Sequence, residues 1–217
     1  IEYYQKAIQL DPNYALAHYG LGLAYTHLGQ YQKSIEYYQK AIQLDPNYAL
    51  AHYGLGLAYT HLGQYQKSIE YYQKAIQLDP NYALAHYGLG LAYTHLGQYQ
   101  KSIEYYQKAI QLDPNYAKAY TGLGFAYHNL REYQKAIEYF KKSIQLDPNE
   151  AKAHYGLGLA YTHLGQYQKS IEYYQKAIQL DPNYALAHYG LGLAYTHLGQ
   201  YQKAIEYYQK AIQLDPN

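Results

Sequence analysis

Residues 15–48 read ALAHYGLGLAYTHLGQYQKSIEYYQKAIQLDPNY, and this stretch decides the fold because the chain repeats it along its whole length. The period is 34 residues, with no insertion between copies. Such a fixed period is typical of a solenoid, in which each repeat packs only on its neighbours. We expect one solenoid domain composed of a half repeat (residues 1–14), repeats 1 to 3 (15–48, 49–82 and 83–116), a diverged repeat 4 (117–150), repeat 5 (151–184) and repeat 6 (185–217).

Each repeat predicts two helices separated by a turn. Gly29 ends the first helix, since glycine tolerates the positive φ of a helix C-terminus. The pair Asp45-Pro46 ends the second helix and predicts the start of the next, because proline suits a first helical position. Apolar residues recur with helical spacing in both halves: Ala17, Leu21, Ala24, Tyr25 and Leu28 in the first, and Ile35, Tyr38, Ala41, Ile42 and Leu44 in the second.

The repeat resembles the tetratricopeptide repeat, a 34-residue helix–turn–helix unit. The resemblance covers the whole chain, although His18 stands where the family usually has a large aromatic residue, which Tyr120 restores in repeat 4. It implies an all-α fold: a right-handed superhelical solenoid of stacked antiparallel helix pairs, with the first helices lining a concave groove. The matching positions in residues 15–48 are Leu21-Gly22, Tyr25, the small Ser34, Tyr38, Ala41 and Pro46.

The first helix of a standard repeat has no charged residue, as the stretch YGLGLAYTHLG at 19–29 illustrates. Its groove face, as the resemblance places it, carries leucine, tyrosine, threonine and histidine. Two interpretations remain open: these side chains pack on one another and tighten the superhelix, or they form a channel for a peptide, because large exposed apolar patches usually mark interfaces. Gly20 lies on the same helix, where it either admits a ligand backbone or adds flexibility.

Repeat 4 changes the predicted groove locally. Lys118 and Lys152 are the charges that we place on this face, and they fit a ligand with an acidic residue near its middle. Neutral drift or a solubilising patch would leave the same pattern. Arg131 replaces the turn glycine, which should cost stability if the position needs positive φ. The predicted groove residues are Leu50, Tyr53, Leu57, Thr60, His61, Leu84, Tyr87, Leu91, Thr94, His95, Lys118, Thr121, Phe125, His128, Asn129, Lys152, Tyr155, Leu159, Thr162 and His163.

The repeated residues do not predict catalysis or a metal site. His18 and His27 are nine residues apart and face opposite sides of their helix. Their equivalents in successive repeats should be too far apart to share a zinc ion with bonds of about 2 Å. No carboxylate is expected in the groove as an acid or a base, and the chain has no cysteine. We therefore expect a protein without enzymatic activity and without a cofactor.

Composition narrows the classes of partner. The formal net charge is only +1, which argues against nucleic acid as the ligand because RNA-reading helical repeats need a basic groove. No apolar run approaches the ~20 residues of a membrane span. No signal peptide is visible at Ile1, which leaves the compartment unknown, and a cytoplasmic location is compatible with the sequence.

The predicted function is a scaffold for protein–protein interaction that binds a peptide or protein segment in the apolar groove. The alternative is a structural or self-assembling array without a dedicated ligand. Ile1, Tyr4 and Ile8 should lack a partner helix, so the uncapped ends could be covered by a second copy of the chain. Near-identical repeats fit both a recent duplication and a designed consensus array.

Overall fold

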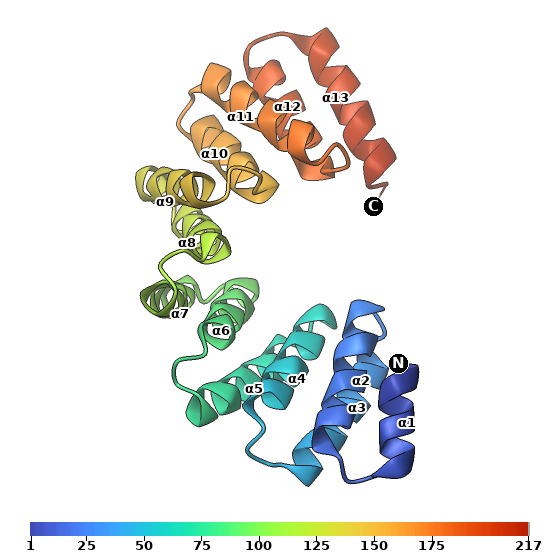
Figure 1. Ribbon diagram of the computed structural model, residues 1–217. Coiled ribbons are helices and arrows are strands. Elements are labelled where there is room, and N and C mark those ends of the chain that lie inside the picture. The colour runs from blue at the N-terminus through green and yellow to red at the C-terminus, as the bar shows by residue number, and fades with distance from the viewer. Residues whose placement is uncertain (217) are drawn as a thin grey trace. The chain divides into compact units, whose positions relative to one another are not determined.

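The structure is a computed structural model that describes residues 1–216, and helices are its only regular secondary structure over that range (Figure 1). The prediction of an all-α fold with two helices in each repeat is confirmed. In chain order the helices are α1 (Glu2–Leu10), α2 (Ala15–His27), α3 (Tyr31–Leu44), α4 (Ala49–His61), α5 (Tyr65–Leu78), α6 (Ala83–His95), α7 (Tyr99–Leu112), α8 (Ala117–Asn129), α9 (Tyr133–Leu146), α10 (Ala151–His163), α11 (Tyr167–Leu180), α12 (Ala185–His197) and α13 (Tyr201–Leu214).

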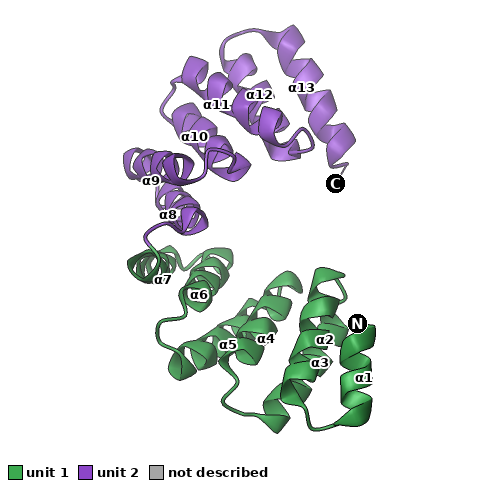
Figure 2. Cartoon of the chain, viewed as in Figure 1, with its two compact units in different colours: residues 1–113 green, residues 114–217 purple. Residues whose placement is uncertain are grey.

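The helices fall into two compact units (Figure 2). Unit 1 covers residues 1–113 and contains α1 to α7, and unit 2 covers residues 114–217 and contains α8 to α13. Within each unit every helix packs against the next one along the chain. The first helices of successive repeats also contact one another: α2 with α4, α4 with α6, α8 with α10, and α10 with α12.

The second helices of neighbouring repeats do not approach one another as closely in the described part of either unit. Repeats are therefore more closely spaced on the side of their first helices than on the side of their second helices. A stack with this difference in spacing is concave on its closely spaced side. Within each unit, the first helices form the inner layer and the second helices form the outer layer.

The turn between the two helices of a repeat is built around one residue with positive φ. Gly29 has a φ of +70°, and its N–H donates to the Thr26 carbonyl at 3.0 Å. The N–H of Gln30 donates to the Tyr25 carbonyl at 2.9 Å. This pair of bonds is a Schellman motif, which satisfies two carbonyls at the end of the helix. Arg131 adopts the same conformation in repeat 4, with a φ of +62°.

The turn between repeats differs from the prediction in one respect. The second helix ends at Leu44, but the next helix begins at Ala49, three residues beyond Pro46. Pro46 therefore lies in the turn and does not start a helix. The Asn47 N–H donates to Oδ1 of Asp45 at 3.0 Å, so the aspartate stabilises the turn locally.

The core of each repeat is centred on one aromatic ring of the second helix. Tyr38 is only 1% exposed, and a Cβ atom added at Gly22 or at Gly54 would lie 2.6 Å or 2.5 Å from its ring carbons. The ring thus occupies space left by two glycines, one in its own repeat and one in the next. Gly20 and its equivalents Gly54, Gly88, Gly156 and Gly190 each make room for an aromatic ring of the preceding second helix, a tyrosine except for Phe140 at Gly156. This explains why the first helix has a second glycine.

Candidate binding groove

The predicted groove residues of unit 1 lie on the inner layer and differ in how far they are exposed. Leu50 and Leu84 are the most open of its apolar members, at 39% and 40% exposed. Tyr53, Leu57, Tyr87 and Leu91 are half-buried, whereas His61 and His95 are exposed. An uncharged face with leucines at its surface can bind apolar side chains, and the histidines add polar groups beside them.

Two rows of tyrosine on this face were missed by the sequence analysis. Tyr48 and Tyr82 directly precede first helices, and their rings lie 5.1 Å and 5.0 Å from those of Tyr19 and Tyr53. Burial raises the pKa of Tyr82, and Tyr53 raises it further. The signal was present in the sequence, because a tyrosine precedes almost every first helix at the period of the repeat.

The second missed row comes from the first residue of each second helix. Tyr31 stacks on His61 of the next repeat, with ring centres 4.5 Å apart and an angle of 3° between the planes. Tyr65 and His95 form the same pair at 4.5 Å. These histidines were predicted from the first helix alone. Their tyrosine partners could not be found from helical spacing, since they belong to a different helix of the preceding repeat.

The predicted groove threonines use their hydroxyl groups inside the repeat. Thr60 Oγ1 donates to the Gly56 carbonyl at 2.9 Å and lies 3.1 Å from Ser68 Oγ and 3.2 Å from the Tyr72 hydroxyl. The arrangement recurs at Thr94 and Thr162. A partner could bond these hydroxyls only by competing with their contacts to the second helix.

Repeat 4 replaces this hydroxyl network with a different one. The positions of Thr60, Ser68 and Tyr72 are taken there by His128, Ala136 and Phe140, so three hydroxyls are absent. Two new hydroxyls form a pair elsewhere in the repeat: Thr121 Oγ1 lies 2.7 Å from Ser143 Oγ, which donates to the Ala117 carbonyl at 3.0 Å. Repeat 4 thus loses three hydroxyl groups at one place and gains two paired hydroxyl groups at another, so its packing arrangement differs from that of the standard repeats.

The charged groove positions of unit 2 are Lys118 and Lys152, which are both exposed. Neither makes an ion pair or a hydrogen bond with the described part of the chain. Glu150 was missed as a third charge: it occupies the position of Tyr48, at the start of α10. Burial and Tyr155 raise the pKa of Tyr184, and the Glu150 carboxylate raises it further. This face therefore carries charges of both signs, with a net charge of +1.

The remaining predicted residues of unit 2 pack with varying depth. Phe125 is half-buried, with its ring centre 4.9 Å from that of Phe140. Asn129 is exposed, and its Nδ2 donates back to the Phe125 carbonyl at 2.8 Å. Tyr155 and Leu159 are also half-buried, as His128 is, whereas Thr121 and Thr162 are buried and His163 is exposed.

The histidines on the other side of the first helix have a structural role. His52 is 6% exposed, and its Nε2 lies 3.0 Å from the Pro46 carbonyl, while its buried Nδ1 has no partner. Burial lowers the pKa of His52. In repeat 4 the hydroxyl of Tyr120 donates to the equivalent carbonyl, that of Pro114, at 3.3 Å. Tyrosine and histidine thus make the same contact at this position.

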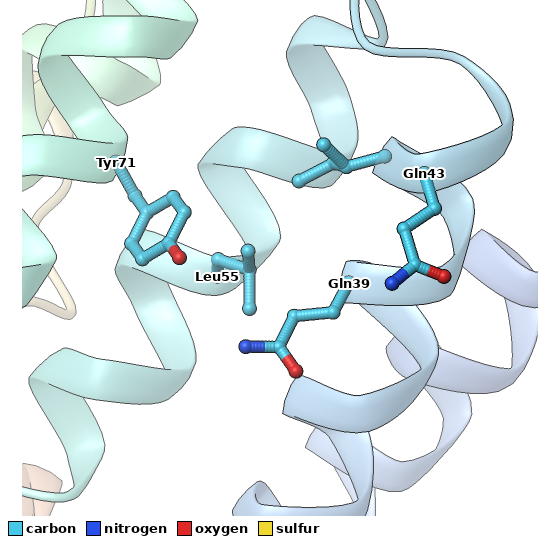
Figure 3. Close-up of a pocket in the computed structure, with 5 residues that line it drawn as sticks. Gln39, Gln43, Leu55 and Tyr71 are labelled. Atoms are coloured by element: carbon cyan, nitrogen blue, oxygen red, sulfur yellow. The ribbon is translucent and has the colours of Figure 1, made fainter.

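A shallow pocket of about 360 Å³ lies outside the predicted groove, on the side of the second helices of unit 1. Gln39 and Gln43 of α3 form its polar edge, and Leu55 of α4 and Tyr71 of α5 lie opposite them (Figure 3). No cluster of three or more potential metal ligands of the His, Cys, Asp or Glu type occurs among residues 1–216. Over the same range, none of the helices has the length and apolar character needed to cross a membrane.

Comparison with known proteins identifies the repeat. The model of the tetratricopeptide repeat matches residues 15–48, 49–82, 83–116, 117–150, 151–184 and 185–217, and that of the Sel1 repeat matches residues 1–12. No curated protein matches the chain.

Solved structures give the same result. A chain of the APC/C hetero-tetramer Cut9–Hcn1 is 23% identical with a TM-score of 0.91; the match covers 99% of this chain but only 42% of that one, so this chain spans less than half of its length. YrrB is 26% identical (TM-score 0.64; 85% and 95% covered), and MamA is 33% identical (TM-score 0.62; 75% and 95% covered). With six matched repeats over nearly its whole length, the chain belongs to the tetratricopeptide repeat family.

Proposed function

We propose that the chain is a non-enzymatic scaffold that binds a peptide or protein segment along the inner layer of its repeats. Membership of the tetratricopeptide repeat family supports an interaction scaffold. YrrB, to which the chain is similar, is described as a TPR protein with an unusual peptide-binding site. Repeats of the same family therefore form a peptide-binding site in YrrB.

One observation carries the proposal: Leu50 and Leu84 remain 39% and 40% exposed on a layer without charge in unit 1. Side chains that served only to tighten the stack would be expected to bury this surface between neighbouring repeats. Exposed leucines beside half-buried tyrosines instead provide apolar area for a partner, and tyrosine combines a wide ring with a hydroxyl group.

The charges of unit 2 give the partner a chemical preference. Lys118 and Lys152 are exposed, and neither forms an ion pair among the described residues. Glu150 at the start of α10 disfavours a segment that is acidic throughout. We propose that the bound segment is mainly apolar and carries a single acidic residue that lies near the two lysines.

A peptide library tests both parts of the proposal. Random 12-residue peptides displayed on phage are selected on the full chain, and the affinities of enriched peptides are measured by fluorescence anisotropy. Leu84→Glu places a charge in the apolar face, and Gln73→Glu is the matched control on the exposed surface of a second helix. We expect Leu84→Glu to weaken binding at least about tenfold, as for a central interface residue, and Gln73→Glu to leave it unchanged.

The double variant Lys118→Leu and Lys152→Leu restores the residue of the standard repeats. We expect it to remove the preference for an acidic residue while apolar peptides still bind. Enriched peptides that bind Leu84→Glu as well as they bind the parent chain would contradict the groove as the binding surface.

Self-association is a second candidate, favoured by the exposed apolar side chains of the outermost helices. None of the residues of α1 is buried, and Ala204 is the single buried residue of α13. Ile205 and Ile212 are 48% and 64% exposed. Sedimentation velocity over a wide concentration range would show a mass that increases with concentration. Ile8→Glu should then reduce association, whereas Leu84→Glu should not.

A further inference from the structure

Three aromatic side chains of unit 2 meet where repeat 4 packs against repeat 5. They come from three successive helices: His128 from α8, Tyr133 from α9 and His163 from α10. The ring centres of the two histidines are 5.0 Å apart, and Tyr133 lies 5.3 Å from His128 and 5.0 Å from His163. The planes of Tyr133 and His163 are almost parallel, at 3°, so this stack fixes the orientation of His163.

His128 has a ring nitrogen without a partner. Its Nε2 atom is buried and makes no hydrogen bond. The standard repeats have threonine here, with a hydroxyl that bonds to the serine and tyrosine of the second helix, as Thr162 does with Ser170 and Tyr174. Repeat 4 has neither partner, because Ala136 and Phe140 take their places. A buried nitrogen left in this state costs free energy that a bound ligand would recover.

The distance between the two histidine rings fits a shared metal ion. Zinc binds imidazole nitrogen at about 2.0–2.1 Å, and two imidazoles on one tetrahedral ion then place their ring centres about 5 Å apart. His128 and His163 already have this separation. Neutral imidazole is also a preferred ligand of the later first-row divalent metals, nickel, copper and zinc.

The protonation state of His128 is suited to binding a cation. Burial, and to a smaller extent His163, lower the pKa of His128 to about 4. The ring is therefore neutral at pH 7, and no proton has to be displaced from it when a metal binds.

We propose that His128 and His163 form a binding site for one divalent transition-metal ion of the zinc, nickel and copper class. The ion lies between the two rings and supplies the partner that Nε2 of His128 lacks. The two histidines provide two ligands, and the exposed side of His163 leaves the other coordination positions to water or to a donor atom of a molecule in the groove. Tyr133 positions His163 through the stack.

The site occurs once in the chain because it needs two histidines, one at the position of His128 in one repeat and one at the position of His163 in the next repeat. The other standard repeats also have a histidine at the position of His163, as His61 is in repeat 2, but none of them follows a repeat with histidine at the position of His128. Histidine occupies that position in repeat 4 alone. The variant His128→Thr therefore restores the standard residue and removes one proposed ligand.

Calorimetric titration of the full chain with Zn²⁺ at pH 7 tests the site without any groove ligand, so the result is independent of the proposed scaffold function. We expect one equivalent of Zn²⁺ to bind, and both His128→Thr and His163→Ala to weaken binding at least about tenfold, equivalent to 1.4 kcal/mol. His61→Ala removes a histidine from the same position of another repeat and should bind like the parent chain. Mg²⁺, which prefers oxygen ligands, should not bind.

Two further measurements make the outcome decisive. Circular dichroism establishes that both variants fold, and Zn²⁺ should raise the thermal unfolding midpoint of the parent chain more than that of His128→Thr, because a ligand stabilises the state that binds it. The proposal is overturned if the parent chain binds no Zn²⁺. It is equally overturned if folded His128→Thr binds Zn²⁺ as tightly as the parent chain, since other histidines would then hold the ion.

Discussion

Arg131 is the only residue other than glycine with a positive φ among residues 1–216. The left-handed conformation costs residues with a Cβ atom about 1–2 kcal/mol, and glycine avoids this cost. A Cβ atom added at the equivalent Gly97 would have no neighbour within 4 Å, so packing does not restrict the residue there. A comparison of arginine and glycine at this turn position therefore reports the free-energy cost of the positive φ, without a change in packing.

Exchange of these two residues gives opposite effects on stability. We expect Arg131→Gly to raise the free energy of unfolding by about 1 kcal/mol, and Gly97→Arg to lower it by a similar amount. Urea denaturation followed by circular dichroism measures both. A loss of stability in Arg131→Gly would indicate that the arginine side chain makes a contact that outweighs the strained backbone.

The buried histidines next to the proline turns predict sensitivity to acid. The pKa of His154 is lowered, mainly by burial and also by Lys176, while the hydrogen bond to the Pro148 carbonyl acts in the other direction. Tyr173 is the ring that faces it, at 6.3 Å. Because the pKa in the fold lies below its unfolded value of about 6.5, the unfolded chain takes up protons first as pH falls. Stability is therefore complete above pH 6.5 and decreases below it.

Repeat 4 provides the control for this prediction, since Tyr120 makes the same contact with a phenol hydroxyl in place of an imidazole. We expect His154→Tyr to reduce the loss of stability between pH 7.5 and pH 5, and to lower the number of protons taken up on unfolding by up to about one. Tyr120→His should do the reverse. Unfolding midpoints measured across this pH range test both, and equal pH dependence in all three chains would refute the role of the buried ring.

At the scale of the helices, neighbouring repeats within each unit are joined by a ring between two glycines, as Tyr38 is placed between Gly22 and Gly54. Gly54→Ala adds a Cβ atom 2.5 Å from the Tyr38 ring, which is closer than packed atoms allow. Overpacking of this kind costs about 1–3 kcal/mol, against a gain of about 1 kcal/mol from the better helix propensity of alanine. We expect a net loss of stability, measured by urea denaturation.

A double-mutant cycle separates the clash from other effects. In a chain that already carries Tyr38→Leu, the ring is absent and Gly54→Ala should no longer destabilise the protein, because the two residues interact directly. An equal loss in both backgrounds would place the cause in the helix itself and not in the packing of Tyr38.

The sequence predicts where the helices lie better than it predicts which side chains contact one another on their surfaces. Period, apolar spacing and the turn glycine are local signals, and they were sufficient for two helices in each repeat. The stacking of Tyr31 on His61 joins a second helix to the following repeat, and the inward hydroxyl of Thr60 depends on Ser68 and Tyr72. Contacts of this kind depend on how helices are placed next to each other, which spacing along one helix does not reveal.

At the scale of the whole chain, stability should be unevenly distributed within unit 1. Helix α1 has no buried residue and contacts only α2 among the described helices, whereas α4 has contacts on both sides. Repeat arrays are stabilised by interfaces between neighbours, so a helix with one neighbour opens most easily.

Limited proteolysis tests this distribution. Chymotrypsin cleaves after aromatic residues, and Tyr3 is 90% exposed. We expect the earliest cleavage at Tyr3 or Tyr4, before any cut within α4 or α5. Mass measurement of the large remaining fragment locates the cut, whereas small peptides from identical repeats could not be told apart. Early cleavage inside residues 49–78 would contradict the expected distribution.

The family, the helix content and the repeat period could all be recognised from residues 15–48 and their repetition along the chain. The special character of repeat 4 could be recognised only in part. Lys118 and Arg131 differ visibly from the standard repeat, but the exchange of one hydroxyl network for another depends on which side chains meet in space. His128 became a candidate for metal binding only when its buried nitrogen and its distance from His163 were known.

Verbatim repetition also has a consequence for the alignment of a partner. A short segment that contacts one repeat finds three equivalent places in residues 15–116, and this degeneracy favours binding by about 0.6 kcal/mol, which is RT ln 3. The same degeneracy lets the segment slide by whole repeats without a change in its contacts. Repeat 4 breaks this translational symmetry, so a partner that must stop at one place along the chain needs to read its altered residues.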